Sequence, residues 1–490
     1  MNKIGFDNEK YLAEQSEYIR QRAAKYGKLY LEFGGKLMND FHAARCLPGY
    51  DPNVKLRLLQ SLKDQAEIIL CIFSGDIERR KMRADFGISY DADAMKLIDD
   101  LTALGLKVAG VVITRYQDQP GVKAFRNKLE SRGVKVYLHY KTDGYPANVE
   151  KIVSEQGYGK NEYVKTEKPI VVVTAPGPGS GKFATCLTQI YHEYRQGRMA
   201  GYSKFESFPV WNLPLKHPLN IAYEAATIDL WDVNLIDPYH KAAYGVETVN
   251  YNRDVDAYPL LKAIWERMTG GECPYKSPTD MGVNRIGFGI VDDEVVQYAS
   301  KQEVIRRYYA ALERLADGRS DESEVAKIAL LFKQLGINTA YRKCTVAARE
   351  RMEQTLGKPA AAIELADGTI VTAKSSPLLG PSAALLLNAM KHLAGIDHSL
   401  RLIPEEMVRP IQHTKTTYLK ARNPRLHTDE VLVALSVLSQ HDDNCRRAIE
   451  CLPLLEGCQV HSTVMLSEVD KKIFRKLGIG LTCDPVRKKL

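Results

Sequence analysis

The sequence has no pair of cysteines in the C-x-x-C spacing and no His-Glu-x-x-His motif, two common signatures of zinc sites. Its nine cysteines are scattered along the chain. Scattered cysteines are typical of a reducing compartment rather than of a disulfide framework. We therefore expect neither a metal site nor disulfide bonds.

Long apolar runs and blocks of positive charge are missing as well. The most apolar stretches, IILCIF and PIVVVT, are far shorter than the roughly twenty residues that span a membrane, and MNKIGFDNEK has no apolar signal core. The net charge is +8, but the 68 basic and 60 acidic residues are mixed. We expect a cytoplasmic protein without membrane or nucleic-acid partners, whose slight positive excess favours anionic ligands.

A chain of 490 residues, 45% of them hydrophobic, is long enough for two or three domains. From residue 28 short apolar segments alternate with helix-like ones, the pattern of βαβ units. The strands are continuously apolar, which indicates that both faces of the sheet are covered. We predict a doubly wound, mostly parallel α/β domain over residues 1–289, with strands at 28–33, 67–73, 107–116, 135–140 and 169–174.

The rest of the chain changes character twice. Residues 290–357 read as long amphipathic helices broken at Asp317-Gly318. Residues 358–490 return to an α/β pattern that begins with a hairpin turning at Asp367-Gly368. The sequence therefore predicts a helical middle segment and a smaller C-terminal α/β domain.

Charged residues follow several of the predicted N-terminal strands. Lys36 follows the first strand, Asp76 the second, Arg115 the third and Lys182 the last. In open parallel sheets ligands bind outside the carboxyl ends of the strands. We therefore expect a crevice in which Lys36, Arg115 and Lys182 bind an anion; the alternative is a set of ordinary polar loops.

The stretch VVVTAPGPGSGK (171–182) resembles a phosphate-binding loop. Its glycines permit positive φ and close approach of the backbone to a ligand, and successive amides followed by a helix start form an anion site. Gly177, Gly179, Ser180, Gly181 and Lys182 are the predicted phosphate-binding residues. A different anion, or a purely structural turn, remains an alternative.

Two positions of this stretch depart from the usual pattern of Gly, four residues, Gly, Lys and Ser or Thr. Pro176 stands at the first glycine and lacks an amide donor. Phe183 replaces the hydroxyl that binds Mg²⁺ in P-loop nucleotidases. The sequence therefore favours phosphate binding and disfavours ATP hydrolysis by the P-loop route.

A polar loop, KSPTDMGVNRIGFGIVDD (276–293), supplies the candidate catalytic residues. Polar loops between packed elements often carry function. Asp280 and Asn284 are assigned to the reacting end, where a carboxylate acts as a base or binds a cation. Arg253 and Asp254 of the upstream NYNRD are candidates for the same face. The alternative is a connection between domains.

Several motifs together resemble a known family: FGGKLMNDFHAARCLPGYDPN, VVVTAPGPGSGK, NYNRD, KSPTDMGVN and VHSTVMLSEVDKKIFRKLGI. The chain resembles, over nearly its whole length, a bacterial uncharacterised family, a domain of unknown function. The resemblance implies a cytosolic protein with a C-terminal part similar in topology to cytidine deaminases. Some members are named ATP-dependent zinc peptidases.

The family resemblance does not supply a reaction. A deaminase needs a C-x-x-C zinc site and a zinc peptidase of the common kind needs His-Glu-x-x-His, and the sequence has neither. The leading hypothesis is an enzyme, of transferase type, acting on a phosphorylated small molecule or nucleotide; its cofactor is unknown. The alternative is a non-catalytic nucleotide-sensing or scaffolding homo-oligomer assembled through its helical segment.

Overall fold

The chain folds into two compact units in a computed structural model, which describes residues 3–35, 37–83 and 87–487. The first unit comprises Ile4–Glu224 and Asp232–Gln297. The second unit is built on residues 225–231 and 298–487. The described part of the predicted helical segment from residue 298 onward therefore shares a unit with the C-terminal sheet.

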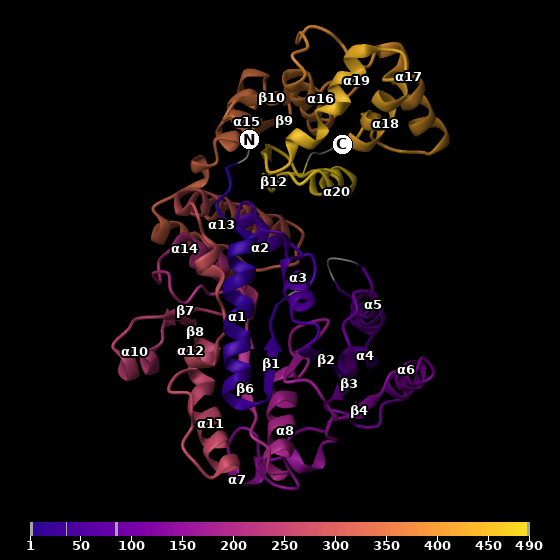
Figure 1. The fold of residues 1–490 in the computed structure, drawn as a ribbon. Helices are drawn as coiled ribbons and strands as arrows, with labels where there is room; N and C mark the ends of the chain where they lie inside the picture. Colours follow the sequence, from indigo (N-terminus) through magenta and orange to yellow (C-terminus); the bar gives the residue numbers. More distant parts are fainter. Residues whose placement is uncertain (1–2, 36, 84–86, 488–490) are drawn as a thin grey trace. The chain divides into compact units, whose positions relative to one another are not determined.

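The first unit contains a six-stranded sheet and a two-stranded one (Figure 1). Its strands are β1 (Leu29–Phe33), β2 (Ala66–Phe73), β3 (Val108–Thr114), β4 (Val136–Leu138), β5 (Ile170–Thr174), β6 (Gly201–Phe205), β7 (Asn234–Ile236) and β8 (Val249–Tyr251). Its helices are α1 (Asn8–Tyr26), α2 (Phe41–Cys46), α3 (Val54–Ser61), α4 (Ser74–Glu78), α5 (Tyr90–Ala103), α6 (Pro120–Glu130), α7 (Val149–Ile152), α8 (Lys182–Arg195), α9 (Pro218–Ala226), α10 (Pro238–Tyr244), α11 (Asn252–Thr269) and α12 (Pro278–Met281), with 3₁₀ turns η1 (Tyr158–Lys160) and η3 (Ile286–Gly289).

The large sheet is parallel, in the order β4-β3-β2-β5-β1-β6. Strand β5 lies inside it, and Val171, Val172 and Val173 are fully buried. A continuously apolar strand of this kind is stable only where helices cover both faces of the sheet. Helix α8 packs on β1, β5 and β6, while α5 packs on β2 and β3.

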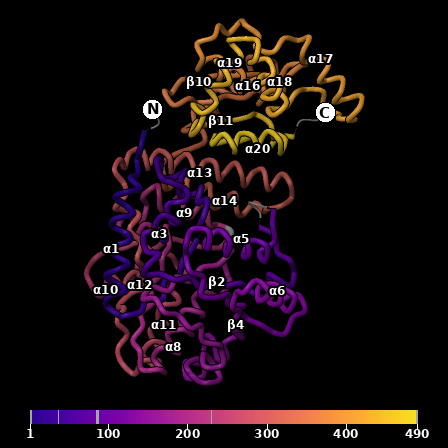
Figure 2. The backbone as a smooth tube through the Cα atoms, turned by 45° about the vertical axis from the view of Figure 1, so that its right-hand side comes forward, coloured from indigo at the N-terminus to yellow at the C-terminus, as the bar shows by residue number. Residues whose placement is uncertain are grey.

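The connections run in opposite directions from the middle of the sheet. The chain passes from β2 to β3 and β4 on one side, and from β5 across β1 to β6 on the other. Right-handed crossovers, the rule for parallel strands, then place α5 and α8 on opposite faces. Figure 2 shows α5 beside β2 and α6 beside β4.

Local sequence signals fix several helix ends of this unit. The side chain of Asp7 accepts the amides of Glu9 and Lys10 and so caps α1, and an Asp at this position satisfies donors that the helix leaves unpaired. Pro120 begins α6. Its lack of an amide hydrogen does not destabilise the helix there, because the first amides of a helix have no partner within it. Gly181, in the left-handed conformation, precedes α8.

The second unit contains a four-stranded sheet in the order β10-β9-β11-β12, antiparallel except for the β11–β12 pair. Helix α13 (Asp293–Ala316) begins in the first unit and continues into the second. The remaining elements are η2 (Ile228–Leu230), α14 (Glu322–Leu335), η4 (Thr339–Tyr341), α15 (Lys343–Gln354), β9 (Ala360–Glu364), β10 (Ile370–Lys374), α16 (Pro381–Leu393), α17 (Glu405–His413), the π-helical η5 (Thr414–Tyr418), α18 (Thr428–Leu438), α19 (Asp443–Glu450), η6 (Leu452–Leu455), β11 (Gln459–Ser462), α20 (Glu468–Lys476) and β12 (Gly480–Cys483).

Strand β9 distributes its side chains between two cores. Ala361 and Ile363 join the large core that includes α16, whereas Ala362 packs with Cys344 and Ala348 of α15. Because successive residues of a strand point to opposite faces, α15 and α16 cover opposite faces of this sheet.

The predicted α/β architecture is thus confirmed at the level of a parallel six-stranded sheet, helices and a smaller mixed C-terminal sheet. The domain boundaries at 289/290 and 357/358 stay predictions. Among the residues that the structure describes, no helix has the length and apolarity needed to cross a membrane.

Candidate functional site

The loop from Ala175 to Lys182 leaves the carboxyl end of β5 and leads directly into α8. Gly179 and Gly181 have φ values of +69° and +87°, a region that disfavours residues with a Cβ. A Cβ on Gly181 would lie 2.9 Å from Cγ2 of Thr114. Conformation and space therefore both require glycine at position 181.

The neighbouring end of β3 holds this loop in place. The hydroxyl of Thr114 donates to the carbonyl of Ser180 at 2.7 Å. The guanidinium of Arg115 donates to the carbonyl of Gly179 and stacks 3.5 Å above the ring of Phe73. The structure thus brings Arg115 and the glycine loop together, with Arg115 bracing the loop.

The start of α8 leaves several hydrogen-bond donors free. The amides of Gly179, Gly181, Lys182 and Phe183 donate to no other group in the described part of the chain. No side chain caps the helix, and its first turn contains no acidic residue. Lys182 itself is half-buried, and its ammonium makes no ion pair with the described residues. These donors form a concentrated positive site.

Phe183 occupies the position where a P-loop nucleotidase has its metal-binding hydroxyl. Its ring packs edge-on against Tyr202 of β6, with centroids 5.6 Å apart. The hydroxyl of Tyr202 donates to Glu32 at 2.7 Å. The position is therefore used for packing between α8 and the sheet.

The other predicted strand-end residues have different outcomes. Lys36 lies outside the residues that the structure describes. Asp76 is buried, and it forms ion pairs with its neighbours Arg79 and Lys81. Its carboxylate is thus engaged by its own segment.

Asp280 lies beside α10 rather than against the glycine loop. Its carboxylate accepts from the hydroxyl of Tyr244 and from the amide of Lys276, both at 2.8 Å. His240 is 3.8 Å away. None of these partners belongs to the 175–182 loop.

Asn284 is buried and holds a loop that follows β6. Its amide donates to the carbonyls of Ser207 and Pro209 at 2.8 and 3.3 Å. Its side-chain oxygen accepts the amide of Ile286. This network positions the segment that begins at Glu206, immediately after β6.

Strand β6 contributes Lys204 to a charged cluster with Glu206, Tyr251 and Asp254, of which only Asp254 was a candidate from the sequence. We call it the Lys204 cluster. The ammonium of Lys204 bonds both oxygens of Asp254, at 2.7 and 2.8 Å, and lies 3.5 Å from Glu206. The hydroxyl of Tyr251 contacts Lys204 and donates to Glu206 at 2.9 Å. The NYNRD motif was the one signal that pointed to this place.

Burial and mutual charge shift the pKa values of the Lys204 cluster. Burial raises the pKa of Glu206, the nearby Asp254 raises it further, and Lys204 opposes both. Burial acts to lower the pKa of Lys204, but Asp254 and Glu206 outweigh this and raise it. The lysine therefore stays charged, while the glutamate holds a proton more readily than a solvated one.

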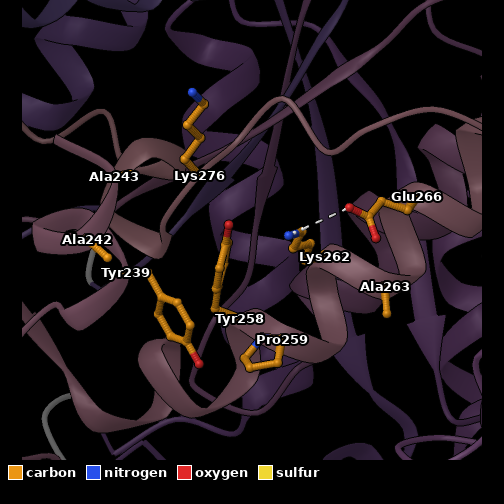
Figure 3. Close-up of a pocket in the computed structure, with 9 residues that line it drawn as sticks. All are labelled: Tyr239, Ala242, Ala243, Tyr258, Pro259, Lys262, Ala263, Glu266 and Lys276. Carbon is orange, nitrogen blue, oxygen red and sulfur yellow. Dashed lines mark ion pairs between the residues drawn. The ribbon is translucent and has the colours of Figure 1, made fainter.

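A separate open depression of about 530 Å³ lies between α10 and α11 (Figure 3). Tyr239 and Tyr258 stand in it with ring centroids 4.6 Å apart. Lys262 and Glu266 form an ion pair along its wall at 3.9 Å. It contains none of the predicted site residues, and its few polar groups do not converge on one point (Figure 3).

Metal-binding geometry is not found at any of these places. Within residues 3–35, 37–83 and 87–487, no group of three or more His, Cys, Asp or Glu side chains could hold a metal ion.

Comparison with known proteins supplies the family. The model described as "Domain of unknown function DUF1846, N-terminal" matches residues 4–336, and its C-terminal counterpart matches residues 340–490. The chain belongs to the DUF1846 family. The resemblance seen in the sequence is thereby confirmed.

Relatives of nearly equal length carry names without an activity. A UPF0371 protein of Clostridium tetani (strain Massachusetts / E88) is 54% identical over 490 residues, which cover 99% of this chain and 98% of the relative. A UPF0371 protein of Clostridium botulinum (strain Langeland / NCTC 10281 / Type F) has the same identity and coverage.

Proposed function

We propose that the 175–182 loop binds the phosphate of a small molecule and that the protein acts on this molecule as an enzyme of transferase type. The observation that carries the proposal is the row of amides at the start of α8, which, like the ammonium of Lys182, have no partner among the described residues. A helix start with free amides and a cation is a ready anion site. Arg115, which braces the loop, adds positive charge beside it.

The position of the loop in the sheet supports the proposal. Strands β2 and β5 are neighbours, and the connections that follow them leave in opposite directions. The carboxyl end of such a switch point is where open α/β sheets bind their ligands. The loop follows β5 at this point.

The departure at Phe183 narrows the ligand class. The lost hydroxyl is the one that binds Mg²⁺ in nucleoside triphosphate hydrolysis, and its place is filled by a ring packed on Tyr202. A phosphate monoester needs the amides and the lysine but not that metal ligand. We therefore favour a phosphorylated metabolite or nucleoside monophosphate over ATP.

Binding is tested by calorimetry with inorganic phosphate, ribose 5-phosphate, glucose 6-phosphate and AMP. Lys182→Met is compared with the charge-matched Lys128→Met, an exposed lysine of α6. A lost charged hydrogen bond costs about 1.5–3 kcal/mol, so Lys182→Met should weaken phosphate binding about tenfold or more, while Lys128→Met should not. If none of the four compounds binds, or both variants bind alike, the proposal fails.

A turnover assay distinguishes an enzyme from a non-catalytic sensor. Incubation of the wild type with a bound compound and a nucleotide or sugar acceptor, followed by mass spectrometry, should give a product that Lys182→Met forms more slowly. Binding without any product favours the alternative, a nucleotide-sensing or scaffolding homo-oligomer. The cytoplasmic location, the homo-oligomer and the deaminase-like C-terminal topology remain proposals from the sequence.

A zinc-peptidase activity is disfavoured. The sequence lacks His-Glu-x-x-His. The described side chains form no cluster of three or more His, Cys, Asp or Glu that could hold a metal ion.

A further inference from the structure

The Lys204 cluster lies at the same edge of the sheet as the 175–182 loop. Lys204 is in β6 and Glu206 follows its carboxyl end, while the loop follows the carboxyl end of β5. All the strands of this sheet run parallel. Both groups therefore lie at the carboxyl-end edge of the sheet, where open α/β sheets bind their ligands.

The sheet sets the spacing between the strand ends that the two groups follow. Only β1 lies between β5 and β6. Neighbouring strands are about 4.8 Å apart, so the ends of β5 and β6 are about 10 Å apart. Gly181 lies against Thr114 of β3, on the far side of β5, whereas Phe183 in the first turn of α8 packs on Tyr202 of β6. The loop and the start of α8 therefore reach across the ends of the intervening strands toward β6.

Gly34 shows the direction in which Glu206 extends. Gly34 directly follows β1, and a Cβ on it would lie 2.3 Å from Cγ of Glu206 and 2.5 Å from its Oε1. The glutamate side chain thus passes over the end of β1, the strand between β6 and β5. It extends from β6 toward the glycine loop.

Glu206 keeps an acceptor available in this direction. Its Oε2 accepts from Tyr251, whereas Oε1 has only the 3.5 Å ion pair with Lys204 within the described chain. Its side chain is 26% exposed and that of Asp254 is 25% exposed. Carboxylates of this kind recognise sugar hydroxyls, as acidic residues do for ribose in dinucleotide folds.

The charge of the Lys204 cluster favours hydroxyl groups over a second phosphate. It contains two carboxylates and one ammonium. Glu32 of β1 is paired in register with Lys204 of β6, and its charge also acts on Glu206. A second anionic group would be repelled there, whereas hydroxyls can donate to the carboxylates and accept from Lys204.

We propose that Glu206 and the Lys204–Asp254 pair bind the hydroxyl-bearing end of a sugar phosphate whose phosphate occupies the 175–182 loop. The proposal rests on the proposed function of the loop. It adds the substrate class and a second half of the site.

The test compares two ligands and three variants by calorimetry on the full chain. Glu206→Gln should raise the Kd of glucose 6-phosphate about tenfold, because a charged acceptor becomes a neutral one, and should leave the Kd of inorganic phosphate unchanged. Lys182→Met should raise the Kd of both ligands. Gly34→Ala, which displaces the Glu206 side chain without removing it, should reproduce the Glu206→Gln pattern.

The outcomes separate the two proposals. If Lys182→Met changes neither Kd, the phosphate site itself is wrong. If Lys182→Met acts as expected but Glu206→Gln and Gly34→Ala leave glucose 6-phosphate binding unchanged, only the hydroxyl site is wrong. Binding of inorganic phosphate without binding of glucose 6-phosphate or ribose 5-phosphate would also overturn it. Gly34→Ala decides the question if Glu206→Gln does not fold.

Discussion

Removal of Lys204 should destabilise the protein measurably, and by an amount that depends on pH. Lys204→Met keeps most of the aliphatic stem but leaves Asp254 and Glu206 close together without their shared counter-charge. Breaking a buried ion pair costs about 3–5 kcal/mol. The side chains of Lys204, Glu206 and Asp254 keep 18%, 26% and 25% exposure, so solvent screening reduces the expected cost to about 2–3 kcal/mol.

The pH dependence follows from Glu206. Its pKa is already raised in the folded protein by burial, and the loss of Lys204 must raise it further. A group whose folded pKa is raised destabilises the protein at high pH and ceases to do so as pH falls through that pKa. The difference in unfolding free energy between variant and wild type should therefore shrink by about 1 kcal/mol between pH 7.5 and pH 5.

Urea unfolding followed by circular dichroism measures this difference. The control is Lys241→Met, because the pair Lys241–Glu247 is more than half exposed on both sides and should contribute less than about 0.5 kcal/mol. Asp254→Asn added to Lys204→Met should recover part of the loss. A cost equal to that of Lys241→Met, or one that grows as the pH falls, would refute the reasoning.

Two further predictions concern other buried networks. Glu193 is fully buried, and its carboxylate accepts hydrogen bonds from Tyr30, Tyr163, Lys28 and Arg198. Glu193→Gln should therefore lower the unfolding free energy by about 2–4 kcal/mol, whereas Glu155→Gln, at an exposed position, should lower it by less than about 0.5 kcal/mol. Equal losses for the two variants in urea unfolding would contradict this prediction. The hydrogen bond to Asp470 raises the pKa of His427 despite partial burial. The His427–Asp470 pair therefore stabilises the folded protein at low pH, and this stabilisation is lost as the pH rises. His427→Gln should accordingly cost about 1 kcal/mol near pH 5.5 and little near pH 8.5 in thermal melts, and a cost independent of pH would argue against the pair.

The apolar run of β5 is a local signal that the sequence reveals, whereas β6, which contains a charged residue paired with a distant one, was not predicted. The short strands β7 and β8 were not predicted either. Val171 to Val173 are buried and require only that helices cover both faces of the sheet. Their apolar run is therefore sufficient to predict β5. Strand β6 reads GYSKF, with a lysine in a run of five residues. Lys204 is tolerated there because Asp254, far along the chain, supplies its counter-charge. No local pattern encodes that pairing.

Helix α1 escaped prediction for a similar reason. Its buried face includes Gln15 and Ser16 beside Tyr11 and Ile19, so the apolar stripe is interrupted. Gln15 is buried because its side chain donates to the carbonyl of Val283 and accepts the amide of Arg285. The sequence indicates a polar loop from residue 276. Its contacts with α1 and with the loop after β6 join residues far apart in the chain, so no local pattern predicts them.

The packing of Phe183 joins the two halves of the proposed site. Phe183, in the first turn of α8, rests on Tyr202 of β6, whose hydroxyl is fixed by Glu32 of β1. Two residues further along β6 is Lys204, with Glu206 after it. Phe183 therefore fixes the start of α8 relative to the Lys204 cluster through the buried Tyr202. If the two proposals hold, a site built in this way would keep a phosphate and a hydroxyl group at a set separation, which suits recognition of one small phosphorylated molecule better than the Mg²⁺-dependent cleavage of ATP.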